Sequence, residues 1–144
     1  MTPEDRNKLF DQLRVDEGCV LHAYLDTKGL ITIGVGRLLD SRAGGGISMD
    51  EALYLFQNDV DKVDRQLSAY GWYTVQDSVR QAALANCAFN LGINGLLKFP
   101  KFLAHMEAKD YAGAVEELIN TPWHAQVGAR ADRIIELIET GAWE

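Results

Sequence analysis

Three residues near the start of the chain, Glu17, Asp26 and Thr32, have side chains that together suit cleavage of a glycosidic bond. Glu17 stands at the C-terminal end of a predicted helix, where the negative end of the dipole raises a carboxyl pKa and favours the protonated form of a general acid. Asp26 opens an exposed turn, where a carboxylate stays ionised. Glycoside hydrolysis needs two carboxyl groups in these two states. Each residue alone is commonplace, and only the combination is specific.

A helix over residues 3–17 is predicted to present Glu17. Thr2, Pro3 and Asp5 form a typical helix start, and Gly18 suits the left-handed cap at the other end. The apolar side chains that recur at helical spacing are those of Leu9, Phe10, Leu13 and Val15.

A β-hairpin is predicted to present Asp26 and Thr32. Residues 26–29 begin with Asp and end with Gly, which favours a type I turn followed by a glycine bulge. In the strand that follows, Ile31, Ile33 and Val35 alternate with Thr32 and two glycines, so we expect the branched residues to be buried. Thr32 would then lie on the open face, where Gly34 and Gly36 leave room for a sugar ring and the hydroxyl can hold a water beside Asp26.

The rest of the chain is predicted to be helical, which makes the fold class α+β. A capping box, Ser48 with Glu51, starts a long helix over 49–67, and a turn follows around Gly71. A nearly all-apolar helix over 78–91, capped by Asp77 and ended by Gly92, is expected at the centre of the core. Shorter helices, broken at Gly95, Pro100 and Pro122, lead to a last helix over about 128–140.

Composition excludes several classes of function. The chain has 144 residues, 47% of them hydrophobic, and a net charge of −7, so it fits one domain or two small lobes. No basic cluster favours nucleic acid, and no apolar stretch is long enough to span a bilayer. The N-terminus lacks an export signal, so we expect synthesis in the cytosol and no stable membrane association.

Metal and disulfide chemistry are not indicated by the sequence. His22, His105 and His124 do not lie at metal-ligand spacing with each other or with the cysteines, which argues against a zinc amidase. Cys19 and Cys87 are expected to be unpaired, small apolar groups. A redox role for Cys19, two residues from Glu17, is the weaker alternative.

The sequence resembles the phage-type lysozymes of glycoside hydrolase family 24 from about Leu9 to Trp143. The interval from Glu17 to Asp26 to Thr32 matches the family's Glu-x8-Asp-x5-Thr triad in residue type and spacing. The segments that carry the resemblance are Arg14–Gly18, Tyr24–Gly29, Ile31–Gly36, Phe56–Asp61, Ala82–Gly92, Trp123, Arg130–Arg133 and Thr140–Trp143.

The resemblance implies a monomeric muramidase without a cofactor that cleaves the β-1,4 bond between N-acetylmuramic acid and N-acetylglucosamine in peptidoglycan, with inversion. Glu17 would protonate the leaving oxygen, while Asp26 and Thr32 would activate water. It also implies a small β-hairpin lobe (about 15–58) and a helical lobe (about 68–144, with helix 3–17), joined by helix 49–67. The implied role is that of an endolysin, held in the host cytoplasm until a separate protein permeabilises the membrane.

Further site residues follow from the same resemblance. Arg130 would support Glu17, and Gly36, Leu38, Phe89 and Asn90 would bind substrate. Arg37 replaces the histidine usual in the family, and we expect it to pair with Asp59 on the long helix. The loop at 40–46 is short, which reduces the small lobe, and no role is assigned to Glu117.

Other functions remain as alternatives. A lytic transglycosylase needs one catalytic Glu and no water, and the intact Asp26–Thr32 pair argues against it. A tail-associated lysozyme, or a non-catalytic wall-binding module of the same fold, is also compatible with this chain. Trp72, Trp123 and Trp143 could stack on sugars, but core packing is the favoured interpretation.

Overall fold

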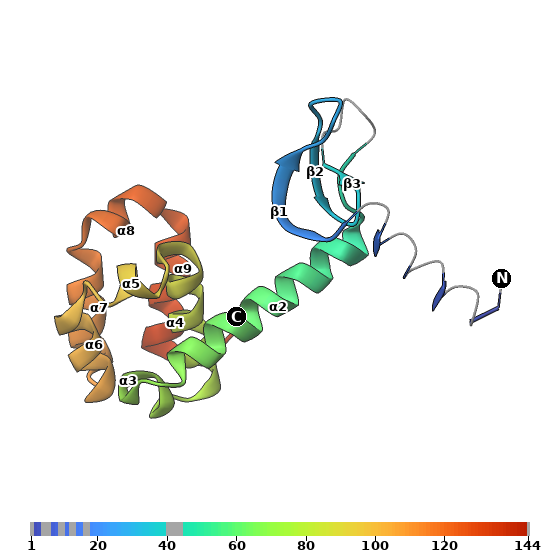
Figure 1. The fold of residues 1–144 in the computed structure, drawn as a ribbon. Coiled ribbons are helices and arrows are strands. Elements are labelled where there is room, and N and C mark those ends of the chain that lie inside the picture. Colours follow the sequence, from blue (N-terminus) through green and yellow to red (C-terminus); the bar gives the residue numbers. More distant parts are fainter. Residues whose placement is uncertain are drawn as a thin grey trace. The chain divides into compact units, whose positions relative to one another are not determined.

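A computed structural model describes residues 2, 3, 7, 8, 11, 14, 15, 18–39 and 45–143 (Figure 1). Residues 3, 7, 8, 11, 14 and 15 are helical. The other residues of the predicted helix 3–17 lie outside the described residues. The subsequent elements are β1 (Val20–Leu25), β2 (Ile31–Gly34), β3 (Arg37–Leu38), α2 (Met49–Leu67), α3 (Gly71–Thr74), α4 (Ser78–Leu91), α5 (Ile93–Leu96), α6 (Pro100–Glu107), α7 (Tyr111–Ile119), α8 (Pro122–Val127) and α9 (Ala129–Thr140). A small sheet followed by helices confirms the α+β fold class.

The chain divides into two compact units, Met1–Tyr54 and Leu55–Glu144. The border falls within α2, whose first turns belong to the first unit. The expected placement of helix 3–17 with the helical lobe stays a prediction. The two units are described separately below.

The first unit contains a three-stranded antiparallel sheet in the order β1-β2-β3. The Gly29 amide donates to the Asp26 carbonyl (3.0 Å), the Asp26 amide donates to the Leu30 carbonyl (2.9 Å), and Gly29 has a φ of 73°. This pattern is the predicted type I turn with a glycine bulge, because only the glycine adopts the left-handed conformation without strain. The predicted hairpin is confirmed.

The predicted burial of β2 is wrong. Thr32 is buried, with 2% of its surface exposed, whereas Ile31 and Val35 are 42% and 41% exposed. Thr32 sits on the central strand between Tyr24 of β1 and Leu38 of β3, which flank it on both sides. Alternation along a strand separates two faces, but it does not tell which of them the rest of the molecule covers.

Helix α2 begins and ends where the sequence predicts. The Ser48 amide donates to Glu51 Oε2 (2.8 Å) and the Glu51 amide donates to Ser48 Oγ (3.2 Å), which is the predicted capping box. Local hydrogen bonds of this kind depend on sequence neighbours alone, so they are readable before the tertiary structure is known.

In the second unit, α4 lies at the centre of a helical core, as predicted. The Asp77 carboxylate accepts from the Arg80 amide (3.0 Å) at its start, and Gly92, with a φ of 71°, follows its last residue. Helix α4 packs against α5 and α9. Its buried residues are Ala83, Leu84, Cys87 and Ala88, and the largest fully buried side chains elsewhere in this unit include Phe102, Leu96, Met106, Leu118, Ile134 and Ile138.

Two predicted breaks are helical instead. Gly71 begins the short helix α3, and Gly95 lies inside α5. Pro100 and Pro122 each start a helix, because the first turn does not need their missing amide hydrogen. Gly141 ends α9 in the left-handed conformation, close to the predicted boundary.

Arg80 ties α4 to the end of α9. Its Nε donates to the Ile138 carbonyl (2.7 Å), its Nη2 donates to the Glu139 carbonyl (3.1 Å), and its guanidinium lies 3.7 Å from the centre of the Tyr111 ring. These carbonyls have no partners within their own helix, so a cation there also opposes the negative end of the dipole.

Among the described residues, no helix is both long and apolar enough to cross a membrane.

Candidate active site

Asp26 holds the hairpin turn together through one of its two carboxylate oxygens. Oδ1 accepts from the Lys28 amide (2.8 Å) and from the Leu30 amide (2.9 Å). Among the residues that the structure describes, Oδ2 has no hydrogen-bond partner. One oxygen therefore fixes the orientation of the carboxylate, and the other remains able to accept a proton.

Thr32 is joined to Asp26 through a single residue, Leu30. The Thr32 hydroxyl donates to the Leu30 carbonyl (3.2 Å), while the Leu30 amide donates to Asp26 Oδ1. Because its hydrogen is used in this way, the Thr32 oxygen is left as an acceptor. The structure thus brings together two of the three predicted catalytic residues and orients both within one turn and strand.

The third predicted catalytic residue, Glu17, lies outside the described residues. Gly18 follows it with a φ of 73°, the left-handed conformation predicted for the end of the first helix. Cys19 and Cys87 are both unpaired, as predicted, but only Cys87 is buried, and the expected packing of Cys19 as an apolar group is wrong because its side chain is exposed. Burial raises the pKa of the Cys87 thiol to about 12, so this thiol is unreactive at neutral pH.

Arg37 pairs with Glu51 and not with Asp59, which corrects the expected pairing. Its Nη2 donates to Glu51 Oε1 (2.7 Å) and its Nη1 donates to Glu51 Oε2 (2.9 Å) and to the Gly46 carbonyl (3.2 Å). Glu51 lies about two helical turns before Asp59 on α2. Because the chain turns back at Gly46 onto β3, the first turn of α2 is the part within reach of Arg37.

We expect the stabilisation by the Arg37–Glu51 pair to be lost at acid pH. The hydrogen bonds from Arg37, helped by the Ser48 amide, lower the pKa of Glu51 from 4.5 to about 2. A carboxyl group whose pKa is lowered by folding stabilises the protein above its unfolded pKa, and this contribution is lost as pH falls through the folded pKa. The melting temperatures of the wild type and Glu51→Gln should therefore differ by a small, constant amount above pH 5 and converge between pH 4.5 and 2.

Arg37→Gln is the matched variant for this measurement, because it removes the main cause of the lowered Glu51 pKa. Its difference from the wild type should shrink over the same pH window. If both differences stay constant down to pH 2, Glu51 is not held by Arg37 in solution.

The two other predicted substrate residues of the first unit flank the same strands. Gly36, with a φ of 66°, lies in the turn between β2 and β3, and Leu38 is the register partner of Thr32. Leu38 is partly buried, so one side of it remains accessible.

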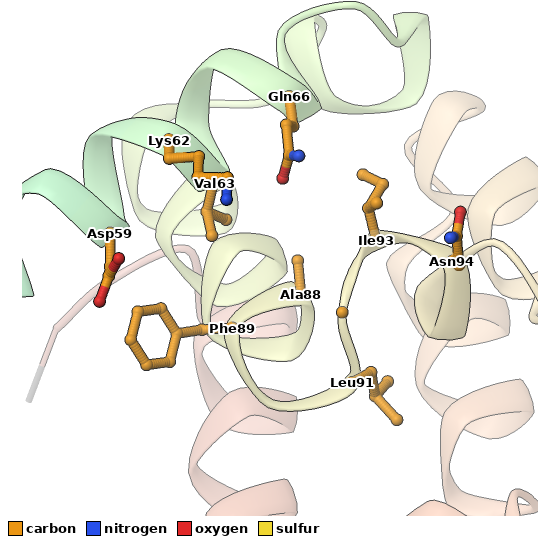
Figure 2. A pocket seen from close by; sticks show the side chains of 10 residues that line it. Asp59, Lys62, Val63, Gln66, Ala88, Phe89, Leu91, Ile93 and Asn94 are labelled. Carbon is orange, nitrogen blue, oxygen red and sulfur yellow. The ribbon is translucent and has the colours of Figure 1, made fainter. Parts of the chain in front are cut away.

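Asp59 lines a pocket of the second unit, with a volume of about 570 Å³. Figure 2 shows side chains of α2 facing this pocket together with residues near the end of α4 and the start of α5. Polar groups come from Asp59, Lys62, Gln66 and Asn94, and the apolar side includes Phe89. The pocket therefore combines an aromatic ring with hydrogen-bonding groups, a composition suited to a sugar.

Asn90, predicted to bind substrate next to Phe89, already has a structural partner. Its Oδ1 accepts from the indole nitrogen of buried Trp123 (2.8 Å). The acceptor oxygen of this amide is thus occupied, and its NH₂ group is the part left for a ligand.

Arg130 lines a second pocket of the helical unit, with a volume of about 530 Å³. Asn86 orients it, accepting from Nε (3.0 Å) and from Nη2 (2.7 Å) through Oδ1. Phe89 lines this pocket too and meets Phe56 edge to face, with ring centres 5.8 Å apart. Trp143 also lines it and is 66% exposed, so core packing is the wrong prediction for this tryptophan, although it is confirmed for Trp72 and Trp123.

A family model described as phage lysozyme matches residues 14–136. A protein named probable T4-type lysozyme 2, from Dictyostelium discoideum, is 33% identical over 162 residues, which cover 94% of this chain and 95% of the relative. The chain belongs to the phage lysozyme family. Probable T4-type lysozyme 1 of the same organism is 31% identical over 91% of this chain and 93% of its own length.

As a member of the phage lysozymes, the chain is a glycoside hydrolase that acts on peptidoglycan. It is also 33% identical to the pre-baseplate central spike protein Gp5 of Enterobacteria phage T4, over 99% of this chain but only 30% of that protein. The resemblance to phage-type lysozymes inferred from the triad and its flanking segments is thereby confirmed.

Sequence reasoning missed two features of this lysozyme. Glu51 was recognised as part of a capping box, but nothing local indicates that it binds Arg37 as well. Trp143 lies two residues after Gly141, which ends α9, and this position could have indicated that its side chain is exposed.

Within the described part of the chain, no group of three or more His, Cys, Asp or Glu side chains could hold a metal ion.

Proposed function

We propose that this lysozyme is a muramidase that cleaves the β-1,4 bond from N-acetylmuramic acid to N-acetylglucosamine with inversion. The observation that supports it most is the coupling of Asp26 and Thr32 through Leu30, on a hairpin at the family's interval from Glu17. The Asp26 carboxylate has one oxygen without a hydrogen-bond partner among the described residues, and the Thr32 oxygen can still accept a hydrogen bond, so both are suited to holding a water molecule.

In the proposed reaction, Glu17 gives its proton to the glycosidic oxygen as the bond to the anomeric carbon breaks. A water held by Asp26 and Thr32 attacks that carbon from the opposite face, and Asp26 takes the water's proton through Oδ2. The products are two shorter glycans, one with a new reducing end. Arg130 is proposed to support Glu17, and Gly36, Leu38, Phe89 and the Asn90 NH₂ group to contact the sugars.

Inversion carries its own structural and chemical requirements. The carboxyl groups of Glu17 and Asp26 should lie about 6.5–9.5 Å apart, the gap that admits water. Proton NMR of the first-formed anomer would decide this point. A retained anomer would make Asp26 a nucleophile and remove the water-holding role of Thr32.

Lysis of permeabilised bacteria, followed as loss of turbidity, tests the proposed function together with analysis of the released sugars. A muramidase releases reducing N-acetylmuramic acid ends. Anhydro-muramic ends would show a lytic transglycosylase, activity lost with a chelator would favour a zinc amidase, and binding without turnover would show a wall-binding module. Each of these three outcomes contradicts the proposal.

The biological setting proposed is that of an endolysin, monomeric and kept in the host cytoplasm until another protein opens the membrane. A tail-associated lysozyme is the second candidate, favoured by the likeness to the Gp5 spike protein over 99% of this chain. Immunoblotting of purified phage particles separates the two, because a tail-associated lysozyme is part of the particle and an endolysin is not.

A further inference from the structure

Arg37, Gly46, Ser48 and Glu51 form a set of side-chain and backbone contacts in the first unit, here called the clasp. Both carboxylate oxygens of Glu51 receive guanidinium hydrogens from Arg37, and Oε2 also accepts from the Ser48 amide. Two parallel bonds between planar groups restrict rotation as well as distance. The clasp therefore fixes Arg37 in direction, which a single ionic contact would not do.

The clasp closes the base of the connection between β3 and α2. The Gly46 amide donates to the Leu38 carbonyl (2.7 Å), and the Gly46 carbonyl accepts from Arg37 Nη1 (3.2 Å). The chain is thus bound to β3 twice. Gly46 binds Leu38 through the backbone, and Glu51, five residues after Gly46, binds Arg37 through its side chain. Strand β3 and the start of α2 become one connected structure.

This connection matters because β3 is only two residues long. Arg37 is the register partner of Ile33, and Leu38 is the partner of Thr32. So short an edge strand has few ladder hydrogen bonds of its own, and its position depends on contacts outside the ladder. Leu38 forms one side of the surroundings of Thr32, so movement of β3 would disturb the Thr32 hydroxyl.

We propose that Glu51 is a positioning residue for hydrolysis: through Arg37 it holds β3 against β2, and so keeps the buried Thr32 side chain in the position in which its hydroxyl donates to the carbonyl of Leu30, the residue whose amide binds Asp26 Oδ1. This inference rests on the proposed function. In this proposal Glu51 acts on no reacting atom directly, and its effect passes through Arg37 and Leu38.

The expected effect on the reaction is larger than the effect on folding. Arg37 and Glu51 have side chains that are 49% and 42% exposed, and ion pairs so exposed contribute little to global stability. Displacement of a reacting group by about 1 Å, in contrast, can slow a reaction by roughly 100-fold. A partial loosening of β3 should therefore lower kcat while the melting temperature changes little.

The first experiment compares Glu51→Gln and Arg37→Lys with the wild type on soluble peptidoglycan fragments at pH 7. Both variants should lower kcat about tenfold and change KM less than about twofold, because the lost interaction acts in the transition state and not in substrate binding. Asp50→Asn is the matched control, since Asp50 is an exposed carboxylate in the same first turn of α2. An equal loss in Asp50→Asn would attribute the effect to helix charge and overturn the proposal.

A double-mutant cycle tests whether Glu51 acts through Thr32. In a Thr32→Ala background, Glu51→Gln should cost almost nothing further, because the group it positions is gone. Losses that multiply would show independent effects and overturn the proposal. The exchanged pair Arg37→Glu with Glu51→Arg should recover part of the kcat.

Amide hydrogen exchange supplies a readout that does not require activity. The Leu39 amide donates to the Ile31 carbonyl (2.7 Å) and the Gly46 amide to the Leu38 carbonyl, so both report on β3. In Glu51→Gln these two amides should exchange faster, while amides of α4 keep their rates. Unchanged exchange overturns the clasp even if the enzyme is active, whereas an inactive wild type with the expected exchange overturns the proposed function and the catalytic role of Glu51 with it.

Discussion

Glu17→Gln should abolish lysis and leave the protein folded. Glutamine keeps the size and hydrogen-bonding capacity of the side chain, but an amide cannot donate the proton that the leaving oxygen needs. Loss of general acid catalysis lowers rates by about 10²–10⁴-fold. The measurement is the initial rate of turbidity loss, with circular dichroism and melting temperature to verify folding.

Asp11→Asn is the control for Glu17→Gln, because Asp11 is an exposed carboxylate in the same predicted helix. It should lyse cells at close to the wild-type rate. A purified Glu17→Gln protein that keeps more than a few percent of wild-type activity would contradict the general-acid assignment. A comparable loss in Asp11→Asn would instead point to the charge of the helix.

Asp26→Asn should reduce activity by a similar factor without opening the hairpin. The asparagine oxygen can still accept from the Lys28 and Leu30 amides, as Oδ1 of Asp26 does, so the turn keeps its hydrogen bonds. What is lost is the second oxygen as a base, and with it the activation of water. Rates of lysis and thermal melting, measured on the same preparation, separate the two functions of this side chain.

Asp26→Ala is the informative comparison for that variant. It removes both turn hydrogen bonds as well as the base, so it should lose activity and also destabilise the protein by about 1 kcal/mol or more. If Asp26→Asn stays active, water activation by Asp26 is wrong, and anhydro-sugar products would then identify a transglycosylase. If Asp26→Asn melts as low as Asp26→Ala, its amide does not replace the carboxylate in the turn.

Features set by neighbouring residues were predictable. The start of α2 follows from Ser48 with Glu51, and the two ends of α4 follow from Asp77 and Gly92, since each cap is a hydrogen bond or a backbone conformation within a few residues. The turn at Asp26 follows for the same reason, and it carries the Asp26 half of the candidate site. The family interval then supplied the pairing with Thr32, whose link through Leu30 is local as well.

Features set by distant residues were not predictable. The period of β2 distinguishes two faces, yet Thr32 is on the covered one because Tyr24 and Leu38 lie across from it on the neighbouring strands. Arg37 was expected to reach Asp59, and the return of the chain at Gly46 put Glu51 within reach first.

The amino-acid sequence by itself determined the family, the spacing of the candidate triad and the positions of most helices, because these depend on residue identity, spacing and short-range hydrogen bonds. Tertiary structure alone decided which side of the sheet is buried and which carboxylate Arg37 binds. It also decided that Trp143 is exposed and that Asn90 accepts a hydrogen bond from the Trp123 indole. The physical reason is that the burial and the ion pairing of a side chain depend on residues that are distant in the sequence and close in space. A local sequence pattern is compatible with several partners for each side chain, and the tertiary packing determines which of them it contacts.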